Sequence, residues 1–474
     1  MNMKDQLWTS DEIVAATRAD VRGAPGSITG VSIDSRTVEP GDLFVAIKGD
    51  AFDGHAFVWD ALERGAVAAL VSEDQIDDRE PNSGALFLVR DSYEGLYDLA
   101  RASRARCEGT MLAITGSVGK TSTKETMRTL LSQFGQTHAP VKSFNNHWGV
   151  PLTLARMPRD TVYGVFEIGM NHANEITPLS KLVQPHVAMI TTVAPVHLEN
   201  LGSLEAIAEA KAEIFDGLLL GGTAVVHGDI DHTELLKQRA KAAGAEHILT
   251  FGHTAGSDAE LMQVALLPDC SSVEARILGQ TLTYKVGAPG EHLVVNSLGV
   301  LVACASLGLD LSKCGIALGQ AEQPEGRGRR HVLDTPGDPI TLLDESYNAN
   351  PASVKAALKV LARVPVSGRG RRIAVLGDML ELGDQAASMH GALAQDVVAN
   401  GVDRLYACGP LMKALWNASP LEKRGAYAES SEGLRSQLLL DLAPGDVVMI
   451  KGSLGSKMGP LVGAILERFP ADQM

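Results

Sequence analysis

The feature that most constrains the fold is a short glycine-bearing turn between an apolar run and a helical pattern. The apolar run, Met111 to Ile114, is typical of a buried strand, and residues Lys124 to Phe134 have helical spacing. The turn between them reads Gly116-Ser117-Val118-Gly119-Lys120-Thr121-Ser122. Glycines let backbone N–H groups close around phosphate oxygens, and a helix start adds the positive end of its dipole. Strand, turn and helix therefore predict a phosphate-binding loop in an α/β domain.

The lysine and the hydroxyl of this turn suit it to ATP. Lys120 is placed to reach the β- and γ-phosphates, and the Thr121 hydroxyl is placed to bind Mg²⁺. The common form of the loop has a glycine five positions before its second glycine, but that position is Ile114 here and the first glycine is Gly116. A chance glycine turn is the alternative. Because strand, lysine, hydroxyl and helix all agree, we expect Gly116 to Ser122 to bind ATP.

Length and composition restrict the class of protein. The 474 residues correspond to about three domains. A formal net charge of −15 argues against a nucleic-acid-binding surface. The five cysteines are scattered without C-x-x-C spacing, which favours reduced thiols over a disulfide frame or a zinc site. No signal-like core and no run of 18 apolar residues occurs, so we expect a cytoplasmic protein without a membrane span.

The chain divides into three α/β units by pattern. Residues 1–106 carry short strands and form a small first domain. Residues 107–328 contain the phosphate loop and predict a central domain with a mostly parallel sheet, in which 260–286 alternates like an antiparallel hairpin. Residues 329–474 repeat strand, polar glycine-bearing loop and helix, which predicts a Rossmann-like, doubly wound domain.

Polar side chains at strand ends are the first candidate site residues. Glu167 stands near the end of the apolar strand 162–168, where a lone carboxylate is costly unless it is hydrogen-bonded, paired or on a metal. Beside a nucleotide loop, a Mg²⁺ ligand is favoured over a structural carboxylate. His197 follows the strand 187–192 and by itself is more typical of a loop histidine. Lys211 lies close to the apolar stripe of the helix 203–216, and a lysine that extends from the stripe to water would also explain it.

Candidates outside the central strands are less specific. Asp34, Ser35 and Arg36 follow a short strand, and a solvated turn is the simpler interpretation. Arg327 lies in the glycine- and charge-rich segment 323–330, which is either a phosphate contact or a basic linker. The loop that begins at Lys451 is assigned no role.

Longer motifs resemble those of the Mur ligases, the ATP-dependent amino-acid-adding enzymes of peptidoglycan synthesis. The matching strings are SFNNHWGVPLT, EIGMNHANEI, APVHLENLGS, EAKAEIF, DESYNANPAS and GDMLELG, with DSRTVEPGDLFVAIKG and DGHAF in the first domain. The resemblance covers nearly the whole chain and is most specific to the members that add a dipeptide. Members that add diaminopimelate or lysine carry Asp-Asn-Pro-Arg, whereas Asn350-Pro351 is followed here by Ala352. Glu345 stands where the family often has Asp, and Leu454 where Arg is frequent.

The resemblance implies an activity and an arrangement of ligands. D-alanyl-D-alanine would be joined to a UDP-N-acetylmuramoyl-tripeptide as ATP becomes ADP and phosphate. The first domain would hold the UDP-sugar, the central domain ATP with Mg²⁺, and the third the dipeptide and part of the nucleotide. We expect a monomer with no nucleic-acid partner.

The resemblance also implies a role for each candidate residue. Lys120, Glu167, His197 and Lys211 would be catalytic; Thr121, Glu167, His197 and a carbamylated Lys211 would hold Mg²⁺; Gly116 to Ser122, Asn296, Arg327 and Asp344 would bind ATP; Asp34, Ser35, Arg36, Asn145, Asn146, Tyr347 and Asn348 would bind substrate.

Two other functions are consistent with the phosphate loop. The loop is shared across the superfamily, so a diaminopimelate-adding ligase or a folylpolyglutamate synthase is the first alternative. A nucleotide-dependent conformational switch is the second. No Asn in the chain is followed by Lys, so the guanine-reading Asn-Lys-x-Asp is absent.

Overall fold

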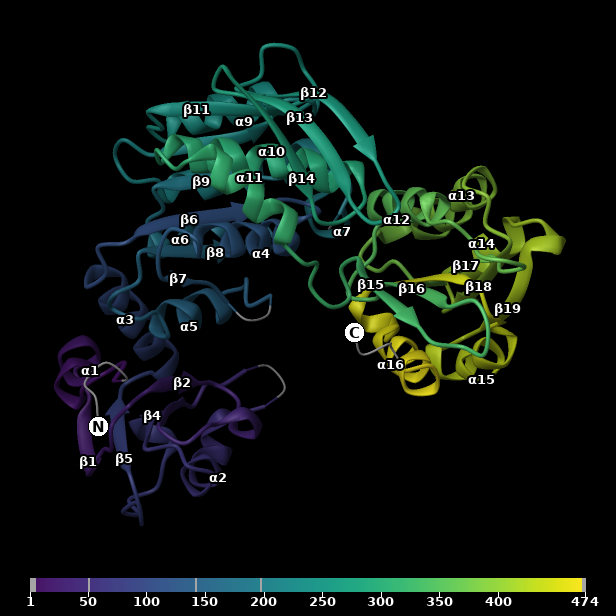
Figure 1. The fold of residues 1–474 in the computed structure, drawn as a ribbon. Helices are drawn as coiled ribbons and strands as arrows, with labels where there is room; N and C mark the ends of the chain where they lie inside the picture. Colours follow the sequence, from purple (N-terminus) through teal and green to yellow (C-terminus); the bar gives the residue numbers. More distant parts are fainter. Residues whose placement is uncertain (1–5, 50–51, 141–142, 197, 471–474) are drawn as a thin grey trace.

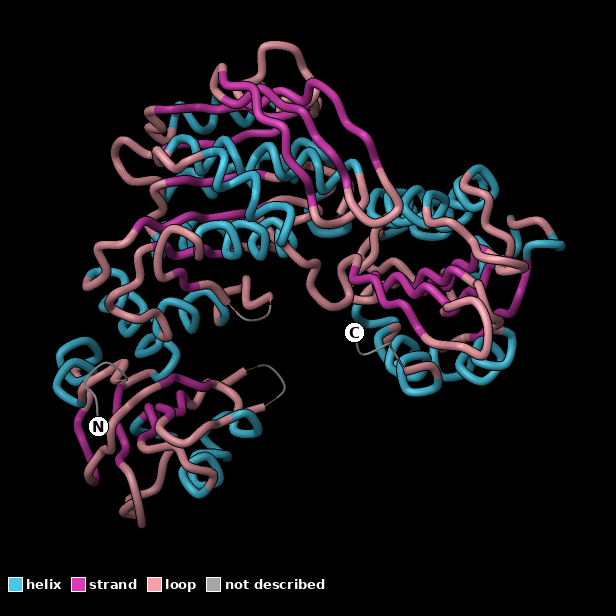
Figure 2. The backbone as a smooth tube through the Cα atoms, in the orientation of Figure 1, coloured by secondary structure: helices cyan, strands magenta, loops and turns pink. Residues whose placement is uncertain are grey.

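The computed structural model describes residues 6–49, 52–140, 143–196 and 198–470. Three α/β units follow one another along the chain, each built around its own sheet (Figure 1). In the view of Figure 1 the central unit lies between the other two, and helices cover its sheet on both faces (Figure 2). None of the helices in these described ranges is long and apolar enough to cross a membrane.

The N-terminal unit has a five-stranded sheet in the order β1-β5-β4-β3-β2. The edge strand β1 is antiparallel to β5, and the other pairs are parallel. A capping box between Thr9 and Glu12 starts the first helix. The elements are α1 Ser10–Thr17, β1 Asp20–Gly23, β2 Gly30–Ser32, β3 Asp42–Val45, α2 Val58–Glu63, β4 Ala68–Ser72, β5 Ala85–Val89 and α3 Ser92–Ala105.

The central unit has a nine-stranded sheet in the order β14-β13-β12-β11-β10-β9-β6-β8-β7. Strands β6 to β12 pair in parallel, and β12, β13 and β14 form the antiparallel extension predicted for 260–286. The strands are β6 Thr110–Thr115, β7 Thr137–His138, β8 Tyr163–Glu167, β9 Val187–Ile190, β10 Thr223–His227, β11 His247–Gly252, β12 Ala259–Leu266, β13 Ser271–Ile277 and β14 Gln280–Val286. The helices are α4 Lys120–Leu131, α5 Gly149–Ala155, α6 Ile176–Val183, α7 Leu198–Leu201, α8 Leu204–Ala212, α9 Thr233–Ala242, α10 Glu291–Ser306 and α11 Leu311–Gln320.

Alternation along β6 shows why its sheet needs helices on both faces. Leu112 and Ile114 pack into the core beneath α4, α10 and α11, whereas Met111 and Ala113 pack into the core beneath α6 and α8. A strand buried on both sides reads as the continuous apolar run seen in the sequence. The helix predicted over 203–216 is α8 followed by a short 3₁₀ turn, and the helix predicted from Lys124 already begins at Lys120.

The C-terminal unit has a six-stranded sheet in the order β15-β16-β20-β17-β18-β19. Only the edge strand β15 is antiparallel to its neighbour. The parallel strands therefore place the polar residues that follow them along one edge, as in other doubly wound sheets. The elements are β15 Arg329–Leu333, β16 Ile340–Glu345, α12 Pro351–Arg363, β17 Arg372–Gly377, α13 Ala386–Ala399, β18 Arg404–Cys408, α14 Met412–Ala418, β19 Arg424–Ala428, α15 Ser431–Asp441, β20 Val447–Lys451 and α16 Gly459–Arg468.

A buried tryptophan joins the N-terminal unit to the central one. The Trp8 indole N–H donates to the Ala155 carbonyl at 2.8 Å, across 147 residues of sequence. The Arg106 guanidinium lies 3.7 Å from the centre of the indole ring. Glu12 extends the junction through its ion pair with Arg159.

Trp8→Phe is expected to lower the free energy of unfolding by about 1–3 kcal/mol, because a buried carbonyl loses its donor. Urea unfolding monitored by circular dichroism measures the change. Trp416→Phe is the control, since the Trp416 indole N–H makes no hydrogen bond within the described residues. An unchanged unfolding free energy for Trp8→Phe would contradict this account of the junction.

Candidate active site

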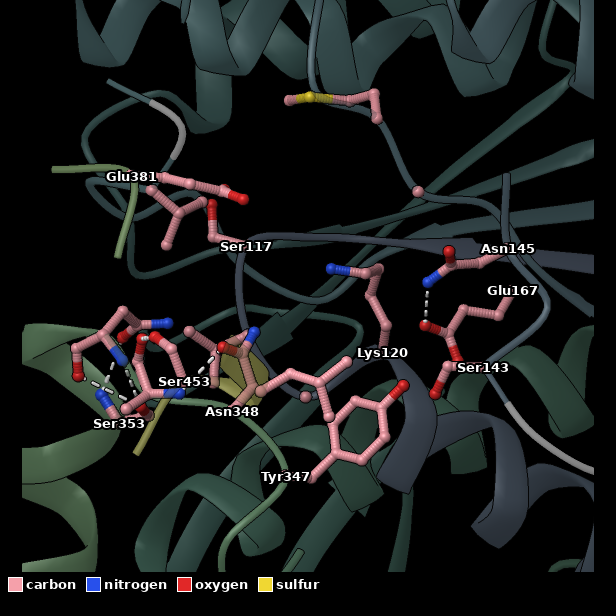
Figure 3. A pocket seen from close by; sticks show the side chains of 18 of the residues that line it. Ser117, Lys120, Ser143, Asn145, Glu167, Tyr347, Asn348, Ser353, Glu381 and Ser453 are labelled. Atoms are coloured by element: carbon pink, nitrogen blue, oxygen red, sulfur yellow. Dashed lines mark hydrogen bonds between the residues drawn. The ribbon is translucent and has the colours of Figure 1, made fainter. Parts of the chain in front are cut away.

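A cleft of about 910 Å³ opens between the central and C-terminal units. The phosphate loop and α6 line one side, and residues after β16 and β20 line the other. Tyr93 and Tyr97, from α3 of the N-terminal unit, complete the lining. Figure 3 shows the cleft with Lys120 and Glu167 on the central side and Tyr347, Asn348 and Ser453 on the C-terminal side.

Both glycines of the phosphate loop are required by its geometry. Gly116 has φ +149°, and a Cβ there would lie 1.9 Å from the Thr191 hydroxyl. Gly119 has φ +86°, and a Cβ there would lie 2.5 Å from the Asn296 amide nitrogen. No other residue type could occupy either position without displacing its neighbour. The loop therefore packs directly against the residue after β9 and against α10.

Hydrogen bonds fix the loop in place. The Ser117 hydroxyl donates to the Ala194 carbonyl at 3.0 Å, and the Thr191 hydroxyl donates to the Val118 carbonyl at 2.6 Å. Lys120 opens α4 and folds back, so that its Nζ donates to the Gly116 carbonyl at 2.7 Å. This places an ammonium group over the turn, where the sequence analysis expects phosphates.

Neighbouring charges shift the pKa of Lys120 in opposite directions. Burial lowers its pKa, the Glu167 carboxylate acts to raise it, and the Arg327 guanidinium acts to lower it further. Two cations, one from the phosphate loop and one from the 323–330 segment, thus approach one point of the cleft. Such a point suits a ligand with several negative charges.

Oxygen atoms gather beside the loop around Glu167, which is 1% exposed. Its Oε2 accepts the Thr121 hydroxyl at 2.6 Å, and its Oε1 accepts the Asn145 amide at 2.7 Å. The Ser143 hydroxyl lies 3.1 Å from that of Thr121. One carboxylate and two hydroxyls fit Mg²⁺, which binds proteins through few oxygen ligands and completes its shell with phosphates and water. Within the described ranges there is no cluster of three or more His, Cys, Asp or Glu, and His197 lies outside them.

Lys211 on α8 is buried, with 2% of its surface exposed. It therefore does not extend to solvent, which removes one of the two interpretations that the sequence left open. It forms no hydrogen bond or ion pair with any described residue. Burial lowers its pKa well below the ordinary value, and the nearby charge of Lys120 lowers it further. Both effects favour the neutral amine over the ammonium form.

Arg327 links the two sides of the cleft. Its guanidinium lies 4.0 Å from the centre of the Tyr347 ring and donates to the Ser143 hydroxyl at 3.1 Å. Asp344 does not line the cleft; it accepts the Gly326 N–H at 2.8 Å and the Ser346 hydroxyl at 2.6 Å. Asp344 therefore holds the segment that carries Arg327.

The amide side chains predicted to bind substrate have structural partners as well. Asn146 Oδ1 accepts the Gly149 N–H at 2.9 Å at the start of α5, and Asn348 Oδ1 accepts the Ala349 N–H at 2.8 Å. Both residues, like Asn145, line the cleft. The amide nitrogens of Asn146 and Asn348 donate to no described residue and can meet a ligand, whereas that of Asn145 donates to Glu167.

Two groups of predicted residues lie apart from the cleft. Asn296 borders a second cavity of about 420 Å³, which adjoins the cleft through Val118 and His292. Asp34, Ser35 and Arg36 lie in the N-terminal unit, where Asp34 accepts the Arg36 N–H at 3.0 Å and pairs with its guanidinium at 2.7 Å. The Arg36 side chain is 83% exposed, so a ligand can reach it beside its ion pair with Asp34.

Two cleft features were missed by the sequence reasoning. Ser143 contributes a hydroxyl beside Thr121. Its motif, SFNNHWGVPLT, indicates the family but predicts no role for this serine. Lys451 forms an ion pair with Glu345 at 3.0 Å. For this pair the available signal was that Glu345 and Lys451 each end a parallel strand, but strand order is needed to see that β16 and β20 are neighbours.

Comparison with known proteins covers the same three units. Family models for "Mur ligase family, catalytic domain", "Mur ligase middle domain" and "Mur ligase, glutamate ligase domain" match residues 27–99, 114–304 and 328–454. The UDP-N-acetylmuramoyl-tripeptide–D-alanyl-D-alanine ligase of Rickettsia prowazekii is 31% identical, over 96% of this chain and 99% of that one. The chain belongs to the Mur ligase family. The resemblance noted in the sequence is thereby confirmed.

Solved Mur ligases share the architecture. MurF from Acinetobacter baumannii superposes with a TM-score of 0.84 at 30% identity, covering 97% of this chain and 99% of that chain. MurF from Thermotoga maritima, solved in complex with ADP, superposes with a TM-score of 0.75 at 27% identity, covering 92% and 97%. The expected three-unit α/β fold is confirmed by these Mur ligase structures.

Proposed function

We propose that this chain joins D-alanyl-D-alanine to a UDP-N-acetylmuramoyl-tripeptide, converting ATP to ADP and phosphate. The observation that carries the proposal is the cleft, in which a phosphate loop faces Arg327 from the 323–330 segment and amides from the C-terminal unit. Full-length similarity to ligases that bear this name supports the choice of substrates. We place the enzyme in the cytoplasm, because each substrate is a soluble metabolite, and we propose that it acts as a monomer.

The proposal assigns each unit a ligand. Residues 1–106 hold the UDP-sugar with Asp34, Ser35 and Arg36, 107–328 hold ATP, and 329–474 hold the dipeptide and part of the nucleotide. Asn296 meets the adenine from the second cavity, and Asp344 supports the nucleotide by holding the Arg327 segment. Tyr347 and Asn348 contact the dipeptide, while Asn145 and Asn146 contact the muramoyl-peptide.

The reaction needs an activated carboxylate, because a carboxylate resists attack by an amine. The terminal carboxylate of the tripeptide attacks the γ-phosphorus, ADP leaves, and an acyl phosphate results. The amine of the dipeptide then displaces phosphate and forms the amide. Lys120 and Arg327 hold the phosphates in line with the carboxylate and offset their charge. Closure of the cleft excludes water, which would otherwise hydrolyse the acyl phosphate.

Thr121, Glu167 and Ser143 are the described residues that would hold Mg²⁺, with His197 added by motif. The ion supplies further charge neutralisation at the phosphates when bound. We propose that Lys211 is carbamylated, which turns its side chain into an anion on the same side of the cleft as the Mg²⁺ ligands. A carbamate forms from CO₂ and a neutral amine, which is the state that burial favours at Lys211.

Product mass spectrometry tests the proposed function directly. The enzyme is given ATP, Mg²⁺, D-alanyl-D-alanine and either the diaminopimelate or the lysine form of the UDP-tripeptide. One product with the mass of a UDP-pentapeptide is expected. ATP hydrolysis that depends on glutamate, or no ligated product, would refute it.

Arg327→Met is expected to raise the KM for ATP by roughly 10- to 100-fold, because a charge-assisted hydrogen bond contributes about 1.5–3 kcal/mol. Steady-state kinetics at saturating dipeptide measure the change. Arg329→Met is the matched control, since Arg329 is two residues away and pairs with Glu325 outside the cleft. Equal KM values for the two variants would count against a phosphate contact at Arg327.

A further inference from the structure

The amine that ends the proposed reaction must first lose a proton. At neutral pH the amino group of a dipeptide is an ammonium ion, which has no lone pair to attack a carbonyl. An ionised carboxylate at the cleft wall would attract this cation and accept its proton. The question is which carboxylate the structure leaves available for that purpose.

Four carboxylates are found among the described residues that line the cleft. Glu167 has both oxygens engaged by Thr121 and Asn145 at the candidate Mg²⁺ site. Glu175 accepts the Asn171 N–H at 2.7 Å and meets the His172 ring at 3.0 Å. These contacts occupy both carboxylates with partners in the central unit.

The other two carboxylates belong to the C-terminal unit, which is proposed to hold the dipeptide. Glu381 is exposed at the rim, in a loop between β17 and α13. Glu345 lies deeper, with 18% of its side chain exposed. It ends β16, immediately before the segment that carries Tyr347 and Asn348.

One oxygen of Glu345 is held and the other is open. Lys451 Nζ donates to Oε2 at 3.0 Å, and only 4% of the Lys451 side chain is exposed. The two residues are in register on neighbouring parallel strands, so the sheet itself fixes the pair. Oε1 accepts no hydrogen bond from any described residue. Gly328 stands beside it with φ +96°, and a Cβ there would lie 3.3 Å from Oε1.

We propose that Glu345 is a catalytic residue whose open oxygen binds the dipeptide ammonium and takes its proton, while Lys451 is a positioning residue that fixes the carboxylate. The inference rests on the proposed ligation. The nitrogen lone pair released by this transfer forms the C–N bond to the acyl carbon. The C–O bond to phosphate breaks, phosphate leaves with the bonding electrons, and the second nitrogen proton passes to it. Glu345 afterwards releases the first proton to water.

Separating the two half-reactions tests this role. Hydroxylamine attacks an acyl phosphate without needing a base, because it is largely unprotonated at neutral pH. Glu345→Gln is expected to slow ligation of D-alanyl-D-alanine by roughly 100-fold or more. Its ATP-dependent formation of hydroxamate from the UDP-tripeptide is expected to stay close to that of the native enzyme. Glu345→Asp, which keeps a carboxylate, is expected to recover part of the ligation rate.

Controls separate the possible failures. Glu432→Gln changes an exposed carboxylate of the same unit and is expected to leave both reactions unchanged. If Glu345→Gln slows hydroxamate formation as much as ligation, or slows neither, the proposal is overturned. Lys451→Met should reproduce the selective loss of ligation, and Lys451→Arg should restore part of it. A native enzyme that forms hydroxamate but no pentapeptide product would instead refute the proposed dipeptide substrate.

Discussion

Lys211→Ala is expected to reduce turnover by at least about a hundredfold, because a preorganised charge beside the transferred phosphate is removed. Added bicarbonate should restore part of the activity by placing an anion in the vacated space. Initial rates of ADP release, with and without bicarbonate, measure both effects. Full activity in this variant would show that turnover needs no carbamate on Lys211.

The native protein offers a readout that does not depend on activity. ¹³C-labelled bicarbonate should give a carbamate signal in the NMR spectrum of the native chain and none in Lys211→Ala. The signal should weaken as the pH falls, because protonation removes the neutral amine that reacts with CO₂. A spectrum without a carbamate signal at alkaline pH would contradict the proposal.

Thermal stability distinguishes a Lys211 variant that has lost only its catalytic group from one that has lost its fold. The pKa of Lys211 is lowered by burial, so between that lowered pKa and its ordinary value of 10.5 the unfolded chain binds a proton that the folded chain does not. The buried amine therefore costs stability at neutral pH, and that cost falls as the pH rises. Lys211→Met is expected to be inactive yet to melt no lower than the native protein in bicarbonate-free buffer. A lower melting temperature would show that Lys211 has a structural role.

Glu167→Gln is expected to raise the Mg²⁺ concentration needed for half-maximal activity by roughly 10- to 100-fold, or to abolish turnover. The substitution removes one negative charge while keeping the shape, and the lost charge-assisted contact is worth about 1.5–3 kcal/mol. Mg²⁺ titrations of ADP release at fixed free ATP measure the shift.

Thr121→Ser is the matched control for this experiment. It keeps the hydroxyl that Glu167 accepts at 2.6 Å, so its Mg²⁺ requirement should stay near the native value. Asn145→Ala would remove the other partner of Glu167 without removing an anion. An unchanged Mg²⁺ dependence in Glu167→Gln would leave Glu167 as a structural carboxylate.

The local elements around the phosphate loop could be predicted because short-range physics decides them. The apolar run before Gly116 can only be a buried strand, and the Thr9 capping box fixes a helix start within four residues. The start of α4 was missed by four residues, because Lys120 and Thr121 interrupt the apolar pattern. The 3₁₀ turn after α8 was also missed, because the apolar spacing continues through it.

Side-chain roles depended on contacts that sequence spacing does not contain. The position of Lys211 in its helix was equally consistent with a lysine that extends to water and with a buried lysine that has a functional role, and only its 2% exposure shows that it is buried. Arg327 was either a linker charge or a phosphate contact, and its place between Tyr347 and Ser143 now supports the second. His197 lies outside the described residues, so its role stays a prediction.

The sequence by itself determined the phosphate loop, the three α/β units and the family, because each depends on local patterns or on long strings of residues. The tertiary structure alone decided which charges meet. Glu345 and Lys451 are 106 residues apart and become partners only because β16 and β20 are neighbours in one sheet. Arg327 reaches Ser143 across 184 residues because the linker folds over the loop. Sheet order is set by the packing of whole units, so it could not be predicted from residues that are close in sequence.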